Sequence, residues 1–327
     1  MLTVPKEIQG LHIIASFSGG KDSTALLVAL QASGLPFTAV FADTGWEHPL
    51  TLEYVDYVAE KLGIVVHKVE KPGGMVARVK HGASFPTRLG RWCTPELKID
   101  PIKKYTHNLR ATVGDTAMAV GVRADESAKR ATLPELSDDY SIGGLDGYVW
   151  RPMLSWTIAD VLTTITGAGL KVNPLYQMGM DRVGCFPCIF AGKSEIRAMA
   201  KLWPERVDQI EAMEAECVSL KVERNLAERD ALLADGWEVA SWANVPIGGQ
   251  MTLLPTQYVK DGKLKRPRYA TMVSTMFMPL KPGVPNGIRR IVQWAQDDRG
   301  GQIPMWENEA RGGCMSWGLC DLPSKKD

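Results

Sequence analysis

The stretch Ser18-Gly19-Gly20-Lys21-Asp22-Ser23 decides the fold of this 327-residue chain. An apolar run at residues 11–17 precedes the stretch and is typical of a buried strand. Residues 24–30 follow it with the apolar spacing of a helix that packs on a core. A strand, a glycine turn and a helix start make an anion site, because the first helical amides lack intrahelical partners and the helix dipole favours negative charge.

The side chains of the stretch suit a phosphate ligand. Gly19 and Gly20 can adopt positive φ, which lets the backbone approach a ligand closely. Lys21 supplies a positive charge, and the hydroxyls of Ser18 and Ser23 supply further hydrogen bonds, with Ser23 a candidate cap of the helix. A glycine turn that only joins a strand to a helix is the alternative interpretation.

The same stretch resembles the PP-loop, S-G-G-x-D-S, of the ATP pyrophosphatase superfamily, with Lys21 at the variable place. It is not a Walker A loop, whose glycines are farther apart. Members of that superfamily bind ATP and cleave it between the α- and β-phosphates, which activates a substrate by adenylation. The resemblance implies an adenine nucleotide with Mg²⁺ as ligand, and catalytic roles for Lys21, Asp22 and Ser23.

Further strands and helices alternate along the chain. Residues 37–42, 64–69 and 116–120 have the composition of buried strands, and residues 50–62 that of a helix. This alternation predicts an α/β fold with a doubly wound, mostly parallel sheet. We expect a PP-loop nucleotide-binding and cluster-binding domain at 1–236 and a helical or irregular C-terminal extension at 237–327.

Polar residues follow the second predicted strand. Ligands of open α/β sheets bind at the carboxyl ends of the strands, so Asp43 and Glu47 could hold Mg²⁺ or a ribose. Related enzymes carry a similar D-T-G-x-E-x-P segment close to the nucleotide. His48 in this segment could carry a proton, or could be a solvated side chain of a polar loop.

A second segment, Gly121 to Arg130, follows the predicted strand at 116–120. It resembles the G-x-R-x-x-E-S-x-x-R segment of the same superfamily, which implies that Gly121, Arg123 and Arg130 help to bind the nucleotide or an oxyanion. Guanidinium groups offer two parallel donors, which suit phosphate and sulfate.

The chain has six cysteines and a net charge of +1. It shows neither a signal-peptide pattern nor an apolar run long enough for a bilayer, so we expect a cytoplasmic protein without membrane partners. Thiols of such a protein are more often ligands or nucleophiles than disulfides. Cys93 precedes Thr94 and Pro95, which begin a predicted helix, and a helix start favours a thiolate.

Cys185 and Cys188 form a C-x-x-C pair in a turn rich in Gly and Pro, which can hold two thiolates on one metal centre. The segment around Cys93, R-W-C-T-x-x-L-K, is similar to one in the phosphoadenosine phosphosulfate (PAPS) reductase branch of the superfamily. The resemblance implies a 4Fe-4S cluster held by Cys93, Cys185 and Cys188, although the Cys-Cys pair of adenylylsulfate reductases is here Trp92-Cys93. Cys314 or Cys320 could be a fourth ligand, a sulfur carrier or a nucleophile.

Zinc held by the same residues is the alternative, because sulfur-rich tetrahedral sites also suit zinc. Cys217 falls in a charged helix predicted at 207–226, and we expect it to be a buried thiol. A basic stretch from Lys260 to Tyr269 is consistent with an exposed hairpin or with a contact to nucleic acid.

Three functions remain open from the sequence. In the favoured one, ATP-dependent adenylation releases AMP and pyrophosphate and is coupled to sulfur insertion into an acceptor, for which a nucleic acid is one candidate. In the second, the chain reduces PAPS or adenylylsulfate and releases sulfite, with Cys314 or Cys320 as nucleophile. In the third, it binds a nucleotide without turnover. The first two need a sulfur or electron donor protein.

Overall fold

The computed structural model describes residues 2–88, 90–138, 147–247, 250–268, 275–277 and 287–296. Contacts divide this part of the chain into two compact units, one made of residues up to 75 with 90–198, the other of 76–88 with the described residues from 199 to 296. The boundary after residue 236 stays a prediction. Within the described ranges, no helix combines the length and the apolar character that crossing a bilayer requires.

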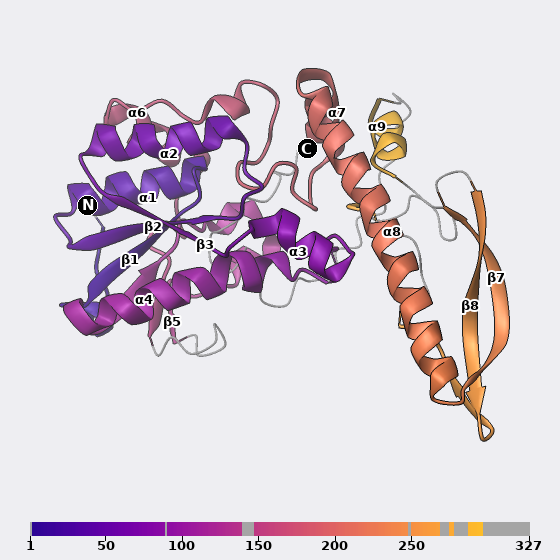
Figure 1. The fold of residues 1–327 in the computed structure, drawn as a ribbon. Coiled ribbons are helices and arrows are strands. Elements are labelled where there is room, and N and C mark those ends of the chain that lie inside the picture. The colour runs from indigo at the N-terminus through magenta and orange to yellow at the C-terminus, as the bar shows by residue number, and fades with distance from the viewer. Residues whose placement is uncertain are drawn as a thin grey trace. The chain divides into compact units, whose positions relative to one another are not determined.

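The first unit contains a six-stranded sheet of order β3-β2-β1-β4-β6-β5 (Figure 1). Neighbouring strands from β3 to β6 are parallel, and β5 pairs antiparallel with β6. The strands are β1 (His12–Phe17), β2 (Phe37–Asp43), β3 (Val66–Glu70), β4 (Thr116–Ala119), β5 (Leu136–Asp138) and β6 (Tyr148–Trp150). The predicted α/β fold with a mostly parallel sheet is confirmed.

Helices cover both faces of this sheet (Figure 1). Successive residues of β1 alternate between the faces, so that Ile13 and Phe17 pack in one core cluster and Ile14 in another. The first cluster includes residues of α1 (Lys21–Ala32), α2 (Pro49–Leu62) and α6 (Ile158–Gly167). The second includes residues of α4 (Asp100–Val113). Strands that are covered on both faces need continuous apolar runs, and the sequences of β1 and β2 are largely apolar.

Short elements complete the first unit. The π-helix η2 (Pro95–Ile99) leads into α4, the 3-10 turn η3 (Ala124–Glu126) leads into α5 (Ala128–Ala131), and the 3-10 turn η5 (Pro174–Tyr176) follows Asn173. The turn η1 (Lys6–Ile8) precedes β1.

The second unit contains the long helix α8 (Pro204–Ala234), an antiparallel sheet of β7 (Glu238–Ile247), β8 (Gln250–Lys260) and β9 (Lys263–Lys265), and α9 (Ile288–Gln296). The basic stretch from Lys260 therefore begins a β8–β9 hairpin, as one of its two interpretations predicted. Cys217 is buried in α8, as expected. The units are divided within α3 (Gly74–Gly82) and α7 (Lys193–Leu202).

Candidate active site

The predicted phosphate loop lies between β1 and the start of α1, at the carboxyl edge of the sheet. Gly19 has φ +76°, and a Cβ there would lie 2.9 Å from Thr51 Cγ2, so the turn requires glycine. Gly20 has φ −85° and is the residue before the first turn of α1. The predicted positive φ is thus found at Gly19 alone of the two.

The prediction that Ser23 caps α1 is wrong, because the helix already begins at Lys21. The Ser23 hydroxyl instead donates to Gly20 O at 3.1 Å and accepts the N–H of Ser18 at 3.2 Å. These bonds hold the turn closed from inside. The two hydroxyls of Ser18 and Ser23 also lie within hydrogen-bond distance of each other, at 3.1 Å.

Two residues that the sequence analysis did not select hold the loop from a distant segment. Asn173 is fully buried, and its Nδ2 donates to Gly19 O at 3.2 Å. The hydroxyl of Tyr176 accepts the N–H of Lys21 at 3.1 Å. The only sequence signal was their place in Asn173-Pro174-Leu175-Tyr176, where an Asn before Pro is typical of a helix start.

Asp22 is buried and forms two ion pairs. Its Oδ1 lies 2.5 Å from Arg123 Nε, and its Oδ2 lies 3.1 Å from Lys21 Nζ. Arg123 also contacts Asp125 at 2.6 Å. A buried carboxylate needs such partners, because an unpaired charge is costly to remove from water.

The predicted phosphate-binding arginines are both paired with carboxylates in this structure. Arg130 is buried and forms an ion pair with Glu126, whose carboxylate also accepts the N–H of Arg123. The geometry therefore gives Arg123 and Arg130 a positioning role at the end of β4. Their direct contact with an oxyanion stays a prediction.

Gly121 leaves no room for a side chain beside the loop. A Cβ at this residue would lie 2.9 Å from the carbonyl carbon and oxygen of Asp22 and 3.1 Å from Ser23 N. The chain that leaves β4 thus packs directly on the first turn of α1. Any side chain at residue 121 would push the loop out of place.

At the neighbouring end of β2, the predicted carboxylates are engaged by their own turn. Glu47 accepts the N–H and the hydroxyl of Thr44, at 3.0 and 2.7 Å. Asp43 Oδ1 accepts the N–H of Gly45 at 2.8 Å. Binding of Mg²⁺ or ribose by Asp43 and Glu47 stays a prediction.

His48 is not the solvated side chain that one interpretation expected, and its role as a proton carrier stays untested. It is buried, its Nδ1 accepts the N–H of Leu50 at 3.1 Å at the start of α2, and its ring meets Phe186 edge-on. It therefore acts as a helix cap.

The C-x-x-C turn reaches this same end of β2. Cys185 forms an isolated antiparallel bridge with Glu47, and its Sγ lies 3.9 Å from Glu47 Oε1. The N–H of Phe186 donates to Trp46 O at 2.7 Å. Since β1 and β2 are adjacent and parallel, the C-x-x-C turn and the phosphate loop both lie at the carboxyl ends of the strands.

The thiols of Cys93, Cys185 and Cys188 gather around Lys98. Burial, together with the neighbouring thiols of Cys185 and Cys188, raises the pKa of Cys93 to about 12. Burial also raises the pKa of Cys185, to about 11. The expected thiolate at Cys93 is therefore wrong for the protein without a bound centre, since a charged sulfur would be poorly solvated there.

Lys98 is the buried cation of this group, and sequence reasoning missed it as a functional residue. Burial by itself lowers the pKa of Lys98, but Cys185, Glu47 and the other two thiols outweigh it and raise the pKa. Burial likewise raises the pKa of Glu47, while Lys98 opposes this change. The available signal was the Lys five residues after Cys93.

Two further cations lie near the thiols. Arg91 Nη1 and the Nε and Nη1 of Arg182 are buried and have no hydrogen-bond partner among the described residues. Both guanidinium groups lie over the ring of Phe190, at 5.6 and 5.8 Å from its centroid. Buried donors without partners are unusual, and they favour an anionic group nearby.

The described ranges contain no group of three or more His, Cys, Asp or Glu side chains arranged to hold a metal ion. The three predicted ligands, Cys93, Cys185 and Cys188, are partly buried free thiols. Cys314 and Cys320 lie outside the described residues. A cluster or zinc ion thus stays a prediction that rests on the donor set.

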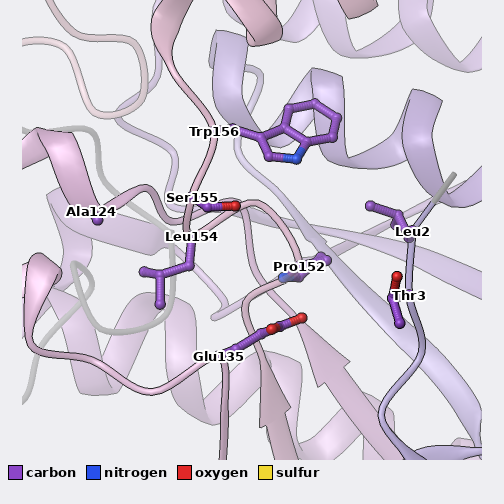
Figure 2. Close-up of a pocket in the computed structure, with 8 residues that line it drawn as sticks. All are labelled: Leu2, Thr3, Ala124, Glu135, Pro152, Leu154, Ser155 and Trp156. Atoms are coloured by element: carbon purple, nitrogen blue, oxygen red, sulfur yellow. The ribbon is translucent and has the colours of Figure 1, made fainter.

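A pocket of about 600 Å³ lies elsewhere in the first unit (Figure 2). Figure 2 shows Trp156 and Glu135 at opposite sides of it, with Ser155 between them. The pocket shares no lining residue with the phosphate loop or the thiols. Its lining consists of Leu2, Thr3, Ala124, Glu135, Pro152, Leu154, Ser155 and Trp156.

A doubly wound, mostly parallel sheet with a glycine loop at the carboxyl end of its strand β1 defines an α/β protein with a candidate anion-binding loop. The model of the phosphoadenosine phosphosulfate reductase domain matches residues 12–191, which is more than half of the chain. The chain therefore belongs to that family.

Curated relatives and a solved structure are similar to this chain. An uncharacterized 37.8 kDa protein of Escherichia phage 186 is 34% identical over 244 residues, which cover 60% of this chain and 72% of that protein. An adenosine 5′-phosphosulfate reductase of Burkholderia cepacia is 28% identical over 187 residues, which cover 56% of this chain and 71% of that protein. The crystal structure of a PAPS reductase from Candida auris matches with a TM-score of 0.44 and 20% identity. The match covers 57% of this chain and 84% of that chain.

The close approach of Gly121 generates a prediction for stability. Gly121→Ala should lower the free energy of unfolding by about 1–3 kcal/mol, because the added methyl group overpacks the loop backbone. Gly167→Ala is the matched control, since residue 167 lies in α6 with open space around it. Urea unfolding measures both, and equal stability of the two variants would contradict the close packing.

Proposed function

We propose that this chain is a sulfonucleotide reductase that binds adenylylsulfate or PAPS and releases sulfite. The observation that carries the proposal is that the phosphate loop and the C-x-x-C turn lie at the carboxyl ends of neighbouring strands. The phosphate loop follows β1, and Cys185 of the C-x-x-C turn pairs with Glu47, which follows the adjacent strand β2. A phosphosulfate bound by the loop would thus extend toward sulfur chemistry. Family membership and the reductase named above support the same activity.

In the proposed reaction, a cysteine thiolate attacks the sulfonate sulfur. The S–O bond to the phosphate breaks, the adenosine phosphate leaves with the electron pair, and the cysteine carries an S-sulfonate. A dithiol protein of the thioredoxin class supplies two electrons: its first thiolate attacks the cysteine sulfur and releases sulfite. Its second thiol then closes the donor disulfide and frees the cysteine. Cys314 and Cys320 are the proposed candidates for the nucleophile.

Residues of the loop would bind the nucleotide. The backbone amides at the start of α1, the hydroxyls of Ser18 and Ser23, and the ammonium of Lys21 would stabilise the phosphate and the charge that develops on the leaving oxygen. Asp22 and Arg123 would hold Lys21 and the loop in place through their buried contacts. This separates the groups that touch the ligand from those that position them.

The three cysteines Cys93, Cys185 and Cys188, with the cations around them, would suit an inorganic centre of net negative charge. Three thiols share one buried region with Lys98, and Arg91 and Arg182 have buried N–H donors without hydrogen-bond partners among the described residues. Cys93, Cys185 and Cys188 would hold such a centre, with a 4Fe-4S cluster favoured over zinc by the family resemblance. When bound, the centre would supply a local electrostatic field that tunes the sulfur group being transferred.

A second candidate is ATP-dependent adenylation coupled to sulfur insertion. The complete loop favours it, because Lys21 and Asp22 form an intact ion pair beside the helix amides. An acceptor oxygen would attack the α-phosphate, and pyrophosphate would leave. Hydrosulfide released by a sulfur donor protein would then attack the acceptor carbon, and AMP would leave with the electron pair of the broken C–O bond; the acceptor could be a nucleic acid or a small molecule.

One assay decides between the two reactions. With adenylylsulfate or PAPS and a reduced thioredoxin, we expect sulfite, and Lys21→Ala should slow its release about a hundredfold through the lost charge. The double change Cys314→Ser with Cys320→Ser should abolish release, whereas Cys217→Ala should not alter it. AMP and pyrophosphate formed from ATP, without any sulfite from the sulfonucleotides, would favour the second candidate.

Metal content is a separate prediction. Protein purified anaerobically should contain iron and acid-labile sulfide, and Cys93→Ser, Cys185→Ser and Cys188→Ser should each lower both. Cys217→Ala is the control, because this thiol is buried in α8. Zinc without iron would identify the alternative centre, and protein free of all three elements would contradict the proposed ligands.

A further inference from the structure

The hydroxyl of Tyr176 occupies a donor that the phosphate loop would offer to a ligand. It accepts the N–H of Lys21 at 3.1 Å. Lys21 is the first residue of α1, so this N–H has no partner within the helix. Amides of this kind are the ones that bind phosphate oxygens at helix starts.

The hydroxyl is held against the loop by a buried contact. Tyr176 ends the turn η5, which begins after Asn173. The side chain of Asn173 accepts the N–H of Leu175 at 3.0 Å and donates to Gly19 O at 3.2 Å, and the residue is fully buried. The same side chain thus fixes both the turn that carries Tyr176 and the glycine turn of the loop.

The side chain of Lys21 is folded back in the same direction. Its Nζ lies 5.2 Å from the centroid of the Tyr176 ring and 3.1 Å from Asp22 Oδ2. A cation over an aromatic ring is attracted to the ring face. Tyr176 therefore contacts both groups of Lys21 that a phosphate would use, the backbone N–H and the ammonium.

We infer that Tyr176 acts as an internal competitor of the nucleotide at the phosphate loop. A phosphate oxygen replaces the Tyr176 hydroxyl on the N–H of Lys21, and the Lys21 ammonium turns from the ring to the phosphate. A charged oxygen forms the stronger hydrogen bond, so an anionic phosphate displaces the hydroxyl and a neutral nucleoside does not. The inference rests on the proposed nucleotide site and adds a selectivity for the phosphorylated form.

The test compares Tyr176→Phe with a matched control. Tyr57→Phe removes a hydroxyl of a half-buried side chain on α2 that accepts the N–H of Lys171, also at 3.1 Å. Calorimetric titrations with adenylylsulfate, AMP, pyrophosphate and adenosine measure the dissociation constants. We expect Tyr176→Phe to bind the three phosphorylated ligands about three- to tenfold more tightly than the wild type, the value of one neutral hydrogen bond. Tyr57→Phe should match the wild type.

The outcomes separate this inference from the function on which it rests. If the wild type binds the phosphorylated ligands and Tyr176→Phe binds them equally or more weakly, Tyr176 supports the loop and the competition is refuted while the nucleotide site stands. If neither the wild type nor either variant binds any phosphorylated ligand, the loop is not a phosphate site. That result would refute both the proposed nucleotide site and the competition by Tyr176. Faster amide hydrogen exchange at Lys21 in ligand-free Tyr176→Phe would support the competition, and unchanged exchange would refute it.

Discussion

The buried ion pair between Arg123 and Asp22 joins the end of β4 to the first turn of α1. Removing one partner of such a pair costs about 3–5 kcal/mol, because the other charge stays buried without compensation. Lys21 gives Asp22 its second cation, and Gly121 brings the β4 chain into contact with the loop backbone. The conformation of the phosphate loop therefore depends on a residue about a hundred positions away. Arg123, which resembles a ligand-binding residue in the sequence, is therefore also placed to hold the loop, and its contact with an oxyanion stays a prediction.

Much of the α/β core could be predicted from the sequence, because the signals are local. Residues 11–17, 37–42 and 116–120 are apolar runs, and they form β1, β2 and β4 with small shifts at their ends. The position of the loop followed from its glycines and the strand before it. The pairing of the loop residues was harder to predict. Ser23 was expected to cap a helix that in fact begins two residues earlier, and His48 gave no sign that it would cap α2 from a buried position.

The environment of the three cysteines could be predicted only in part from the sequence near each of them. The sequence indicated Cys93, Cys185 and Cys188 as partners, and the structure gathers all three around Lys98. The helix start after Cys93 predicted a thiolate, but burial among other thiols outweighs the amides and raises the pKa. The contacts of Asn173 and Tyr176 with the loop join residues more than 90 positions apart. Spacing within one segment carries no information about such contacts.

The proposed function requires that the amides at the start of α1 bind the phosphate chain of an adenine nucleotide. A titration of ¹⁵N-labelled protein with adenylylsulfate, followed by NMR of the backbone amides, tests it most directly. We expect the largest shifts, which should also saturate, at residues 19–23 and from Gly121 to Arg123. Unmoved loop amides, with the shifts confined to Thr3, Glu135 and Trp156 around the separate pocket, would contradict it.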